Sequence, residues 1–240
     1  MTLIVCVKSC ERDYKLGFHE AIRETWGKDL KQLGVQVMFF MGHSGGNYFA
    51  QHPEGVSNNL LRDEVVVDAA DDYNSLPHKT RAICKWAQPK VFRHLFLCDN
   101  DTFINAKALC ALPYEIFDYS GYFKGGESEI GKTFSYKDHM GEYPNCHTWA
   151  SGGLGYFISK NAVDLIVETY PKYWAEDLYV GQVLGPEIQK GRMLGMALQM
   201  NRIATWHYLK TGKNPAFTPD LLRQIYKDGS PDKIYEEARR

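Results

Sequence analysis

The sequence predicts an α/β fold with a largely parallel sheet. Short apolar runs alternate with amphipathic segments along most of the 240 residues, which is typical of strands joined by crossover helices. The composition, with 44% hydrophobic and 24% charged residues, is that of an ordinary globular protein, and no internal repeat is evident. The length suits one sizeable core, so we expect a single domain over residues 1–240.

Each apolar or amphipathic run predicts one element. Strands are expected at 3–9, 35–42, 64–69 and 94–98, helices at 17–30, 76–90 and 176–185, and a strand followed by a helix at 155–170. The range 119–149 is rich in glycine, tyrosine and charge without a clear period, so we expect a surface insertion that acts as a lid or acceptor loop. Two short C-terminal helices are expected within 218–240, because two threonine or serine caps there precede prolines.

Charge and cysteine usage exclude several classes of partner. Lysine and arginine number 28 against 29 acidic residues, a balance with no electrostatic footprint for nucleic acid or an anionic membrane. The opening "MTLIVCVKSC" lacks a basic leader and is too short to span a bilayer, so it reads as a strand. The six cysteines lack metal-type spacing and fit the core of a protein in a reducing compartment. These features favour a cytoplasmic protein with no membrane span.

The stretch "HLFLCDNDTFIN", residues 94–105, carries acids at the end of a predicted strand. In a strand Asp99 and Asp101 share one face and Asn100 points the other way. Ligands bind where parallel strands end, and paired carboxylates favour a hard cation such as Mg²⁺ or Mn²⁺. The motif therefore suggests a metal-bridged nucleotide, although either aspartate would also serve as a simple turn cap.

Five segments together carry a family resemblance. They are "AIRETWG" (21–27), "DAADDYNSLPHKT" (68–80), "CDNDTFIN" (98–105), "SGGLGYFIS" (151–159) and "EDLYVG" (176–181). In this order and spacing the chain resembles the β-1,3-glycosyltransferases of glycosyltransferase family 31. The resemblance implies a GT-A fold with a single Rossmann-like mixed sheet flanked by helices. It also implies an inverting transfer of galactose, N-acetylglucosamine or a similar sugar from a UDP-sugar, with Mn²⁺ or alternatively Mg²⁺, to a glycan or glycoconjugate acceptor, forming a β-1,3 linkage.

The resemblance assigns roles around the acidic motif. Asp99 and Asp101 fall on the metal-binding positions, while Asn100 replaces the central acid, which is expected to contact the donor sugar. Asp71 and Lys79 match positions of the second segment and are candidates for holding the nucleotide. An ordinary ion pair explains Asp71 and Lys79 equally well.

The remaining assignments lie later in the chain. Asp177 is implied as the catalytic base, although an acid at a helix start is also an ordinary cap. Gly152 and Gly153 are implied to contact the donor sugar; the alternative is that they only form a turn. His207 is the best placed histidine for a third metal ligand; the alternative is a structural histidine held by hydrogen bonds. Arg23 is expected to pin its helix to the sheet rather than bind phosphate.

Two other classes remain as alternatives. A nucleotidyltransferase on a similar sheet would need a basic, glycine-rich phosphate loop early in the chain, which we do not find. A carbohydrate-binding module without catalysis fits the 13% aromatic content but leaves the two acidic motifs unexplained. Animal members of the family carry a Golgi membrane anchor, so we expect a soluble bacterial, phage or viral member, or else an excised catalytic domain of the Golgi lumen.

Overall fold

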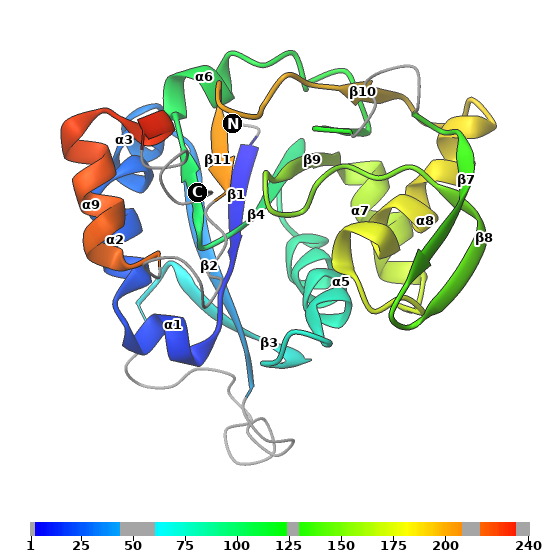
Figure 1. Ribbon diagram of the computed structural model, residues 1–240, viewed down its shortest axis with the longest axis horizontal. Coiled ribbons are helices and arrows are strands. Elements are labelled where there is room, and N and C mark those ends of the chain that lie inside the picture. The colour runs from blue at the N-terminus through cyan, green and yellow to red at the C-terminus, as the bar shows by residue number, and fades with distance from the viewer. Residues whose placement is uncertain (1–2, 44–60, 124–129, 208–216, 234–240) are drawn as a thin grey trace.

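The computed structural model describes residues 3–43, 61–123, 130–207 and 217–233. Within them a seven-stranded mixed sheet forms the middle of three layers (Figure 1). Its strands, in spatial order, are β10 (Gly195–Ala197), β6 (Tyr119–Gly121), β9 (Tyr156–Ser159), β4 (His94–Asp99), β1 (Leu3–Lys8), β2 (Gln36–His43) and β3 (Glu64–Ala70). The expected α/β fold with a Rossmann-like mixed sheet flanked by helices is confirmed.

Strand β1 lies at the centre of a parallel block. It pairs in parallel with β2 and β4, β2 pairs in parallel with β3, and β9 runs antiparallel to both β4 and β6. Every residue of β1 is buried, as expected for a strand covered on both faces. Because β1, β3 and β4 run in one direction, their carboxyl ends meet at one edge of the sheet.

The side chains of β1 alternate between two cores. Val5 and Val7 pack into the core under α2 (Phe18–Glu24), α3 (Trp26–Gln32), α6 (Ala106–Cys110) and α9 (Pro219–Asp228). Ile4 and Cys6 pack into the opposite core under α5 (Leu76–Ala87), α7 (Lys160–Glu168) and α8 (Glu176–Gln189). In Figure 1 the first set, with the short α1 (Glu11–Lys15), covers the left face of the sheet and the second covers the right.

The single helix expected at 17–30 is wrong, because the chain forms α2 and α3 there with a break at Thr25. The Thr25 backbone leaves the helical region, with φ −113° and ψ −121°. Its hydroxyl donates to the carbonyl of Ala21 at 2.6 Å. Such a bond from a threonine hydroxyl to the preceding turn competes with the helical pattern and bends the chain.

The range 119–149 is not a simple surface insertion. Its first residues form β6 inside the main sheet, between β9 and β10. Strands β7 (Thr133–Asp138) and β8 (Gly141–His147) form an antiparallel hairpin next to α8, at the right edge of Figure 1. The hairpin's role as a lid or acceptor loop stays a prediction.

The C-terminal caps act as expected. The Thr218 side chain accepts from the Leu221 amide at 3.1 Å, and Gly229 ends α9 with φ 61°. Residues 231–233 are helical, and the rest of the second expected helix lies outside the described residues. All six cysteines are free. In the part of the chain that the structure describes, no helix has both the length and the apolar character to cross a membrane.

Candidate active site

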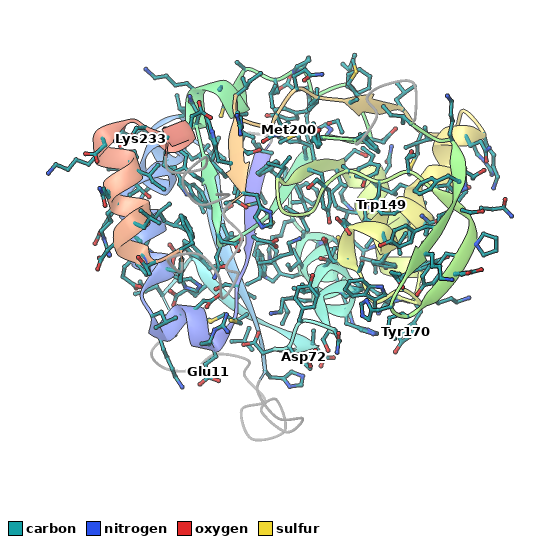
Figure 2. The ribbon with its side chains drawn as sticks, viewed as in Figure 1. Glu11, Asp72, Trp149, Tyr170, Met200 and Lys233 are labelled. Carbon is teal, nitrogen blue, oxygen red and sulfur yellow. The ribbon has the colours of Figure 1, made fainter. Side chains whose placement is uncertain are left out.

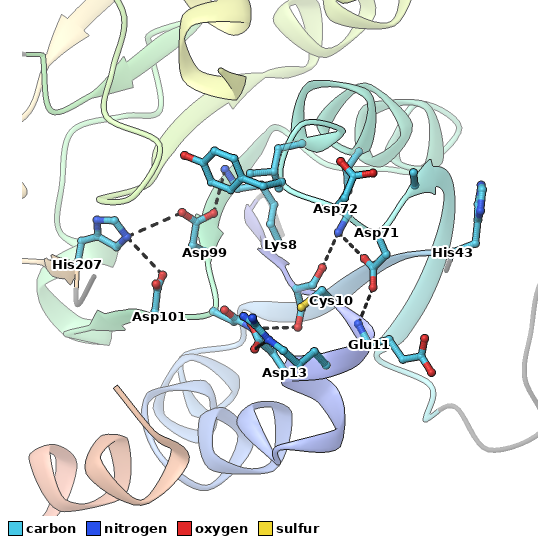
Figure 3. Close-up of a pocket in the computed structure, with 17 residues that line it drawn as sticks. Lys8, Cys10, Glu11, Asp13, His43, Asp71, Asp72, Asp99, Asp101 and His207 are labelled. Atoms are coloured by element: carbon cyan, nitrogen blue, oxygen red, sulfur yellow. Dashed lines mark hydrogen bonds and ion pairs between the residues drawn. The ribbon is translucent and has the colours of Figure 1, made fainter. Parts of the chain in front are cut away.

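A pocket of about 850 Å³ opens at the carboxyl ends of β1, β3 and β4 (Figure 3). Its described lining holds three lysine or arginine side chains, Lys8, Arg12 and Lys79. Against these stand six carboxylates, from Glu11, Asp13, Asp71, Asp72, Asp99 and Asp101. An anionic ligand such as a diphosphate is repelled by this lining unless a cation enters with it.

Asp99, Asp101 and His207 meet at one side of the pocket. Asp99 ends β4, a two-residue turn follows, and β5 (Thr102–Ile104) pairs antiparallel with β11 (Thr205–His207). The register sets His207 opposite Thr102, which places its ring beside Asp101. His207 Nε2 lies 3.4 Å from Asp101 Oδ1 and 4.0 Å from Asp99 Oδ2 (Figure 3).

This cluster has the composition and shape of a divalent-metal site. One ligand atom from each of the three residues lies within 4.8 Å of the others. Asp101 Oδ1 is buried and accepts no hydrogen bond from the described residues, although buried oxygens normally have a partner. Burial alone would lower the pKa of His207, but Asp101 and Asp99 raise it above its ordinary value, so the cluster attracts positive charge. The residues present therefore fit a cation.

The two aspartates converge for a different reason from the one expected. Strand alternation does not set their directions, since β4 ends at Asp99 and residues 100–101 form a turn. Asn100 does point away from the pair. Its amide donates to Ser9 Oγ and to Asp13 Oδ2, each at 3.0 Å, and the Asn100 side chain is buried. The residue that replaces the family's central acid is therefore held beside a buried carboxylate.

Sequence reasoning missed Lys8. This buried ammonium at the end of β1 donates to Glu176 Oε2 at 2.9 Å and lies 3.3 Å from Asp99 Oδ1. Burial would lower the pKa of Lys8, but the charges of Asp99 and Glu176 raise it above its usual range, so the side chain stays charged. Lys8 thus joins the acidic cluster to the start of α8. The available signal was a lysine ending the apolar run of the central strand.

Asp71 and Lys79 form a buried ion pair in the pocket wall. Lys79 Nζ lies 2.6 Å from Asp71 Oδ1 and donates to the carbonyl of Ser9 at 2.7 Å. The carboxylate of Asp71 also accepts from the amides of Gly42, at 2.7 Å, and Glu11, at 2.6 Å. The pair therefore ties together the ends of β1, β2 and β3. Nucleotide contact by Asp71 and Lys79 stays a prediction.

Glu176 and Asp177, adjacent at the start of α8, have different surroundings. Glu176 is buried and accepts hydrogen bonds from Lys8, Thr80 and Tyr156. Asp177 is partly buried and accepts from the amides of Gly152, at 3.2 Å, and Leu178, at 2.9 Å. Burial, and next the charge of Glu176, raise the pKa of Asp177 to about 6.

Gly152 and Gly153 each leave room for one of the acidic sites. A Cβ on Gly152 would lie 2.9 Å from Glu176 Oε2, and a Cβ on Gly153 would lie 2.2 Å from the His207 ring. The carbonyl of Gly153 accepts from Thr102 Oγ1 at 2.8 Å. The glycines thus let the 152–153 turn pass between β5, β11 and α8. Their contact with a donor sugar stays a prediction.

Arg23 has the structural role expected of it. Its guanidinium makes two bonds to Asp63, at 2.9 and 2.8 Å, and contacts Glu64 as well. This arrangement anchors α2 to the start of β3. It also leaves Arg23 away from the described lining of the pocket.

Comparison with known proteins places the chain in a family. Residues 19–188, more than half of the chain, match the Galactosyltransferase family. The chain belongs to this family and is a glycosyltransferase. β-1,3-Galactosyltransferase 5 of Pan troglodytes is 25% identical over 232 residues, which cover 87% of this chain and 77% of the relative. The resemblance to the β-1,3-glycosyltransferases is thus confirmed at the level of the family.

Solved structures show weaker similarities. The catalytic domain of Drosophila β1,4-galactosyltransferase 7 shares 15% identity and a TM-score of 0.47, covering 90% of this chain and 74% of that one. A T. maritima inositol-1-phosphate CTP transferase shares 14% identity and a TM-score of 0.49, covering 100% and 96%. Similarity at this level decides neither the reaction nor the substrate.

Proposed function

We propose that the protein transfers galactose, N-acetylglucosamine or a similar sugar from a UDP-sugar to a hydroxyl of a glycan or glycoconjugate, with inversion and in a metal-dependent way. One observation carries the proposal. Asp99, Asp101 and His207 form a cluster suited to a divalent cation in an acid-rich pocket. Lys8 connects this cluster to the start of α8, where Asp177 has a pKa raised to about 6. The proposed metal site and the proposed base would thus be separate and adjacent.

The donor is proposed to bind in the pocket of about 850 Å³. Asp99, Asp101 and His207 would hold Mn²⁺, or alternatively Mg²⁺, because carboxylate oxygens with one imidazole suit such an ion. The ion would offset the charge of the diphosphate leaving group. Lys8 keeps Asp99 in place and moderates the local negative charge.

Asp177 is proposed as the general base. An inverting transfer is one displacement at the anomeric carbon, in which a carboxylate takes the proton of the attacking hydroxyl as the new bond forms. A pKa of about 6 leaves Asp177 ionised near neutral pH, yet makes it a better proton acceptor than an ordinary aspartate. Glu176 is unsuited to this role because its oxygens are already bonded to Lys8, Thr80 and Tyr156.

Family membership and the 25% identical β-1,3-galactosyltransferase 5 support galactose and a β-1,3 linkage as the first choices of sugar and product. The alternatives lack a comparable observation. A carbohydrate-binding module has no use for a carboxylate whose pKa is raised, as that of Asp177 is. A nucleotidyltransferase would need a basic, glycine-rich phosphate loop early in the chain, which the sequence does not offer. Neither is proposed further.

The test is a screen for slow donor hydrolysis with water in place of the acceptor. UDP-galactose, UDP-N-acetylglucosamine and UDP-glucose are each incubated with the protein and Mn²⁺, and released UDP is measured, with EDTA as the control. We expect one donor to be hydrolysed, and hydrolysis to stop with EDTA. Equal UDP release with and without the metal would contradict metal dependence, and release from none of the three would contradict the donor class.

A further inference from the structure

Three aromatic side chains form a continuous wall beside α8. The ring centroids of Phe134 and Trp149 lie 5.6 Å apart at 27°, and those of Tyr136 and Trp149 lie 5.0 Å apart at 80°. The Phe134 side chain is 40% exposed, and Tyr136 and Trp149 are partly exposed. This aromatic wall, Phe134, Tyr136 and Trp149, therefore keeps ring surface open to solvent, which is uncommon for clustered large apolar groups.

The aromatic wall contacts α8 on the face that carries Asp177. Gly181 follows Asp177 by one helical turn, so the two share a face of α8. A Cβ on Gly181 would lie only 2.5 Å from Trp149 Cβ and 3.1 Å from Trp149 Cα, so the chain at Trp149 packs directly against that face. Burial raises the pKa of Tyr136, and the charges of Asp138 and then Asp177 raise it further, so the phenol lies within electrostatic reach of Asp177.

The aromatic wall is separate from the nucleotide pocket. None of its three residues belongs to the described lining of that pocket, which the loops after β1, β3 and β4 supply together with His207. Figure 2 shows Trp149 on the side of the molecule that carries α7, α8 and the β7–β8 hairpin, whereas Glu11 and Asp72 of the pocket lie at its lower edge. Asp177 is thus linked through the charge of Lys8 to the pocket, and through Gly181, one helical turn away, to Trp149 of the aromatic wall.

We propose that the aromatic wall is the acceptor subsite and that it takes a saccharide ring, packed through its apolar C–H face, with one hydroxyl directed at Asp177. This inference rests on the proposed function, since in an inverting displacement the acceptor attacks from the side opposite the diphosphate. An aromatic face carries negative charge density, which attracts C–H edges, and it removes apolar ring surface from water. A serine side chain or a lipid tail has no comparable flat face for it.

Direct binding tests the subsite without turnover. Methyl β-galactoside, methyl β-N-acetylglucosaminide and methyl β-glucoside serve as probes in saturation-transfer NMR, with UDP and Mn²⁺ present. We expect saturation of the ring C–H protons in at least one glycoside, and at least a tenfold weaker affinity in Tyr136→Ala and in Phe134→Ala. Tyr170→Ala, which removes a 65% exposed ring that packs on His78, is the matched control and should bind like the wild type. Circular dichroism of each variant confirms that it is folded.

Two outcomes would overturn the subsite. One is equal glycoside affinity in the wild type and in folded Tyr136→Ala and Phe134→Ala; the other is a wild-type protein that binds none of the three glycosides. Failure of the proposed function looks different, because wild-type protein would then hydrolyse no UDP-sugar whatever the glycosides do. Rescue of binding by Tyr136→Phe supports ring packing, since only the hydroxyl is lost. No rescue by Tyr136→Phe would contradict packing as the basis of recognition.

Discussion

Glu176 and Asp177 are neighbours in sequence, yet Glu176 accepts three side-chain hydrogen bonds, whereas Asp177 has a carboxylate whose pKa is raised to about 6. Glu176 accepts hydrogen bonds from the side chains of Lys8, Thr80 and Tyr156. Among the described residues, Asp177 accepts from the backbone amides of Gly152 and Leu178, and its pKa is about 6. The charge of the first carboxylate helps to raise the pKa of the second. These surroundings favour a structural role for Glu176 and support the proposal that Asp177 is the base.

Replacing each acid by its amide should distinguish these two roles. Asp177→Asn should lower the transfer rate by about 10²–10⁴-fold, because the base is lost, while UDP and Mn²⁺ affinity stay near wild type. Glu176→Gln should instead lower the free energy of unfolding, since Lys8 loses a negatively charged partner and one acceptor oxygen is replaced by an NH₂ group that cannot accept from Lys8, Thr80 or Tyr156. Turnover at saturating donor and acceptor, together with urea unfolding, measures both effects. Wild-type activity in Asp177→Asn would contradict the base assignment and leave Asp177 as an ordinary residue of a helix start.

The pH profile should follow Asp177. Its pKa is raised to about 6, first by burial, so the carboxylate is neutral below that pH and ionised above it. The base acts in the ionised form, so kcat/KM should fall about tenfold per pH unit below pH 6 and level off above it. The profile is measured with Mn²⁺ saturating at each pH. An acid limb near pH 4, or a limb near pH 6 that persists in Asp177→Asn, would argue against this assignment.

The contact between Asn100 and Asp13 predicts a compensating pair of substitutions. Asn100→Asp places two buried carboxylates where an amide now donates at 3.0 Å, so the free energy of unfolding should fall by about 1–3 kcal/mol. Adding Asp13→Asn restores a donor facing an acceptor and should recover most of that loss. Urea unfolding of the two single variants and the double variant gives the coupling between them. Strictly additive effects would mean that the contact does not explain Asn100.

The Asp71–Lys79 pair should matter for stability whether or not it touches the nucleotide. Lys79→Ala leaves the buried Asp71 carboxylate without its cationic partner, so the free energy of unfolding should fall by about 3–5 kcal/mol. Lys15→Ala, which breaks an exposed pair with Glu11, is the matched control and should cost less than about 1 kcal/mol. Similar midpoints of urea unfolding for the two variants would contradict a structural role for the buried pair.

Much of the sheet could be predicted because its strands are buried on both faces and read as apolar runs. The hairpin of β7 and β8 could not, since most of β7 is exposed and shows no clean alternation. The break at Thr25 was missed because the apolar pattern continues across it, and one hydroxyl decides the bend. Strand β6 was missed because it has three residues and takes its place only from its neighbours in the sheet.

The candidate site was partly predictable for a related reason. Asp99, Asp101 and Asp177 stand out by their motifs, and His207 by its place after an apolar run. The structure brings Asp99 and Asp101 together with His207. Lys8 was not found, because its partner Glu176 lies 168 residues away in the chain. Asp13 meets Asn100 across 87 residues. The sheet topology brings residues at such separations into contact, so no local sequence pattern predicts these contacts.

Asp101 is proposed to belong to a metal site that holds UDP. The most direct measurement is isothermal titration of UDP into the wild-type protein, Asp101→Asn and the exposed-site control Asp164→Asn, each with Mn²⁺ and with EDTA. We expect UDP to bind the wild type and the control only when Mn²⁺ is present, and the affinity of folded Asp101→Asn to fall at least tenfold. Tight binding of UDP in EDTA, or wild-type affinity in Asp101→Asn, would contradict the account.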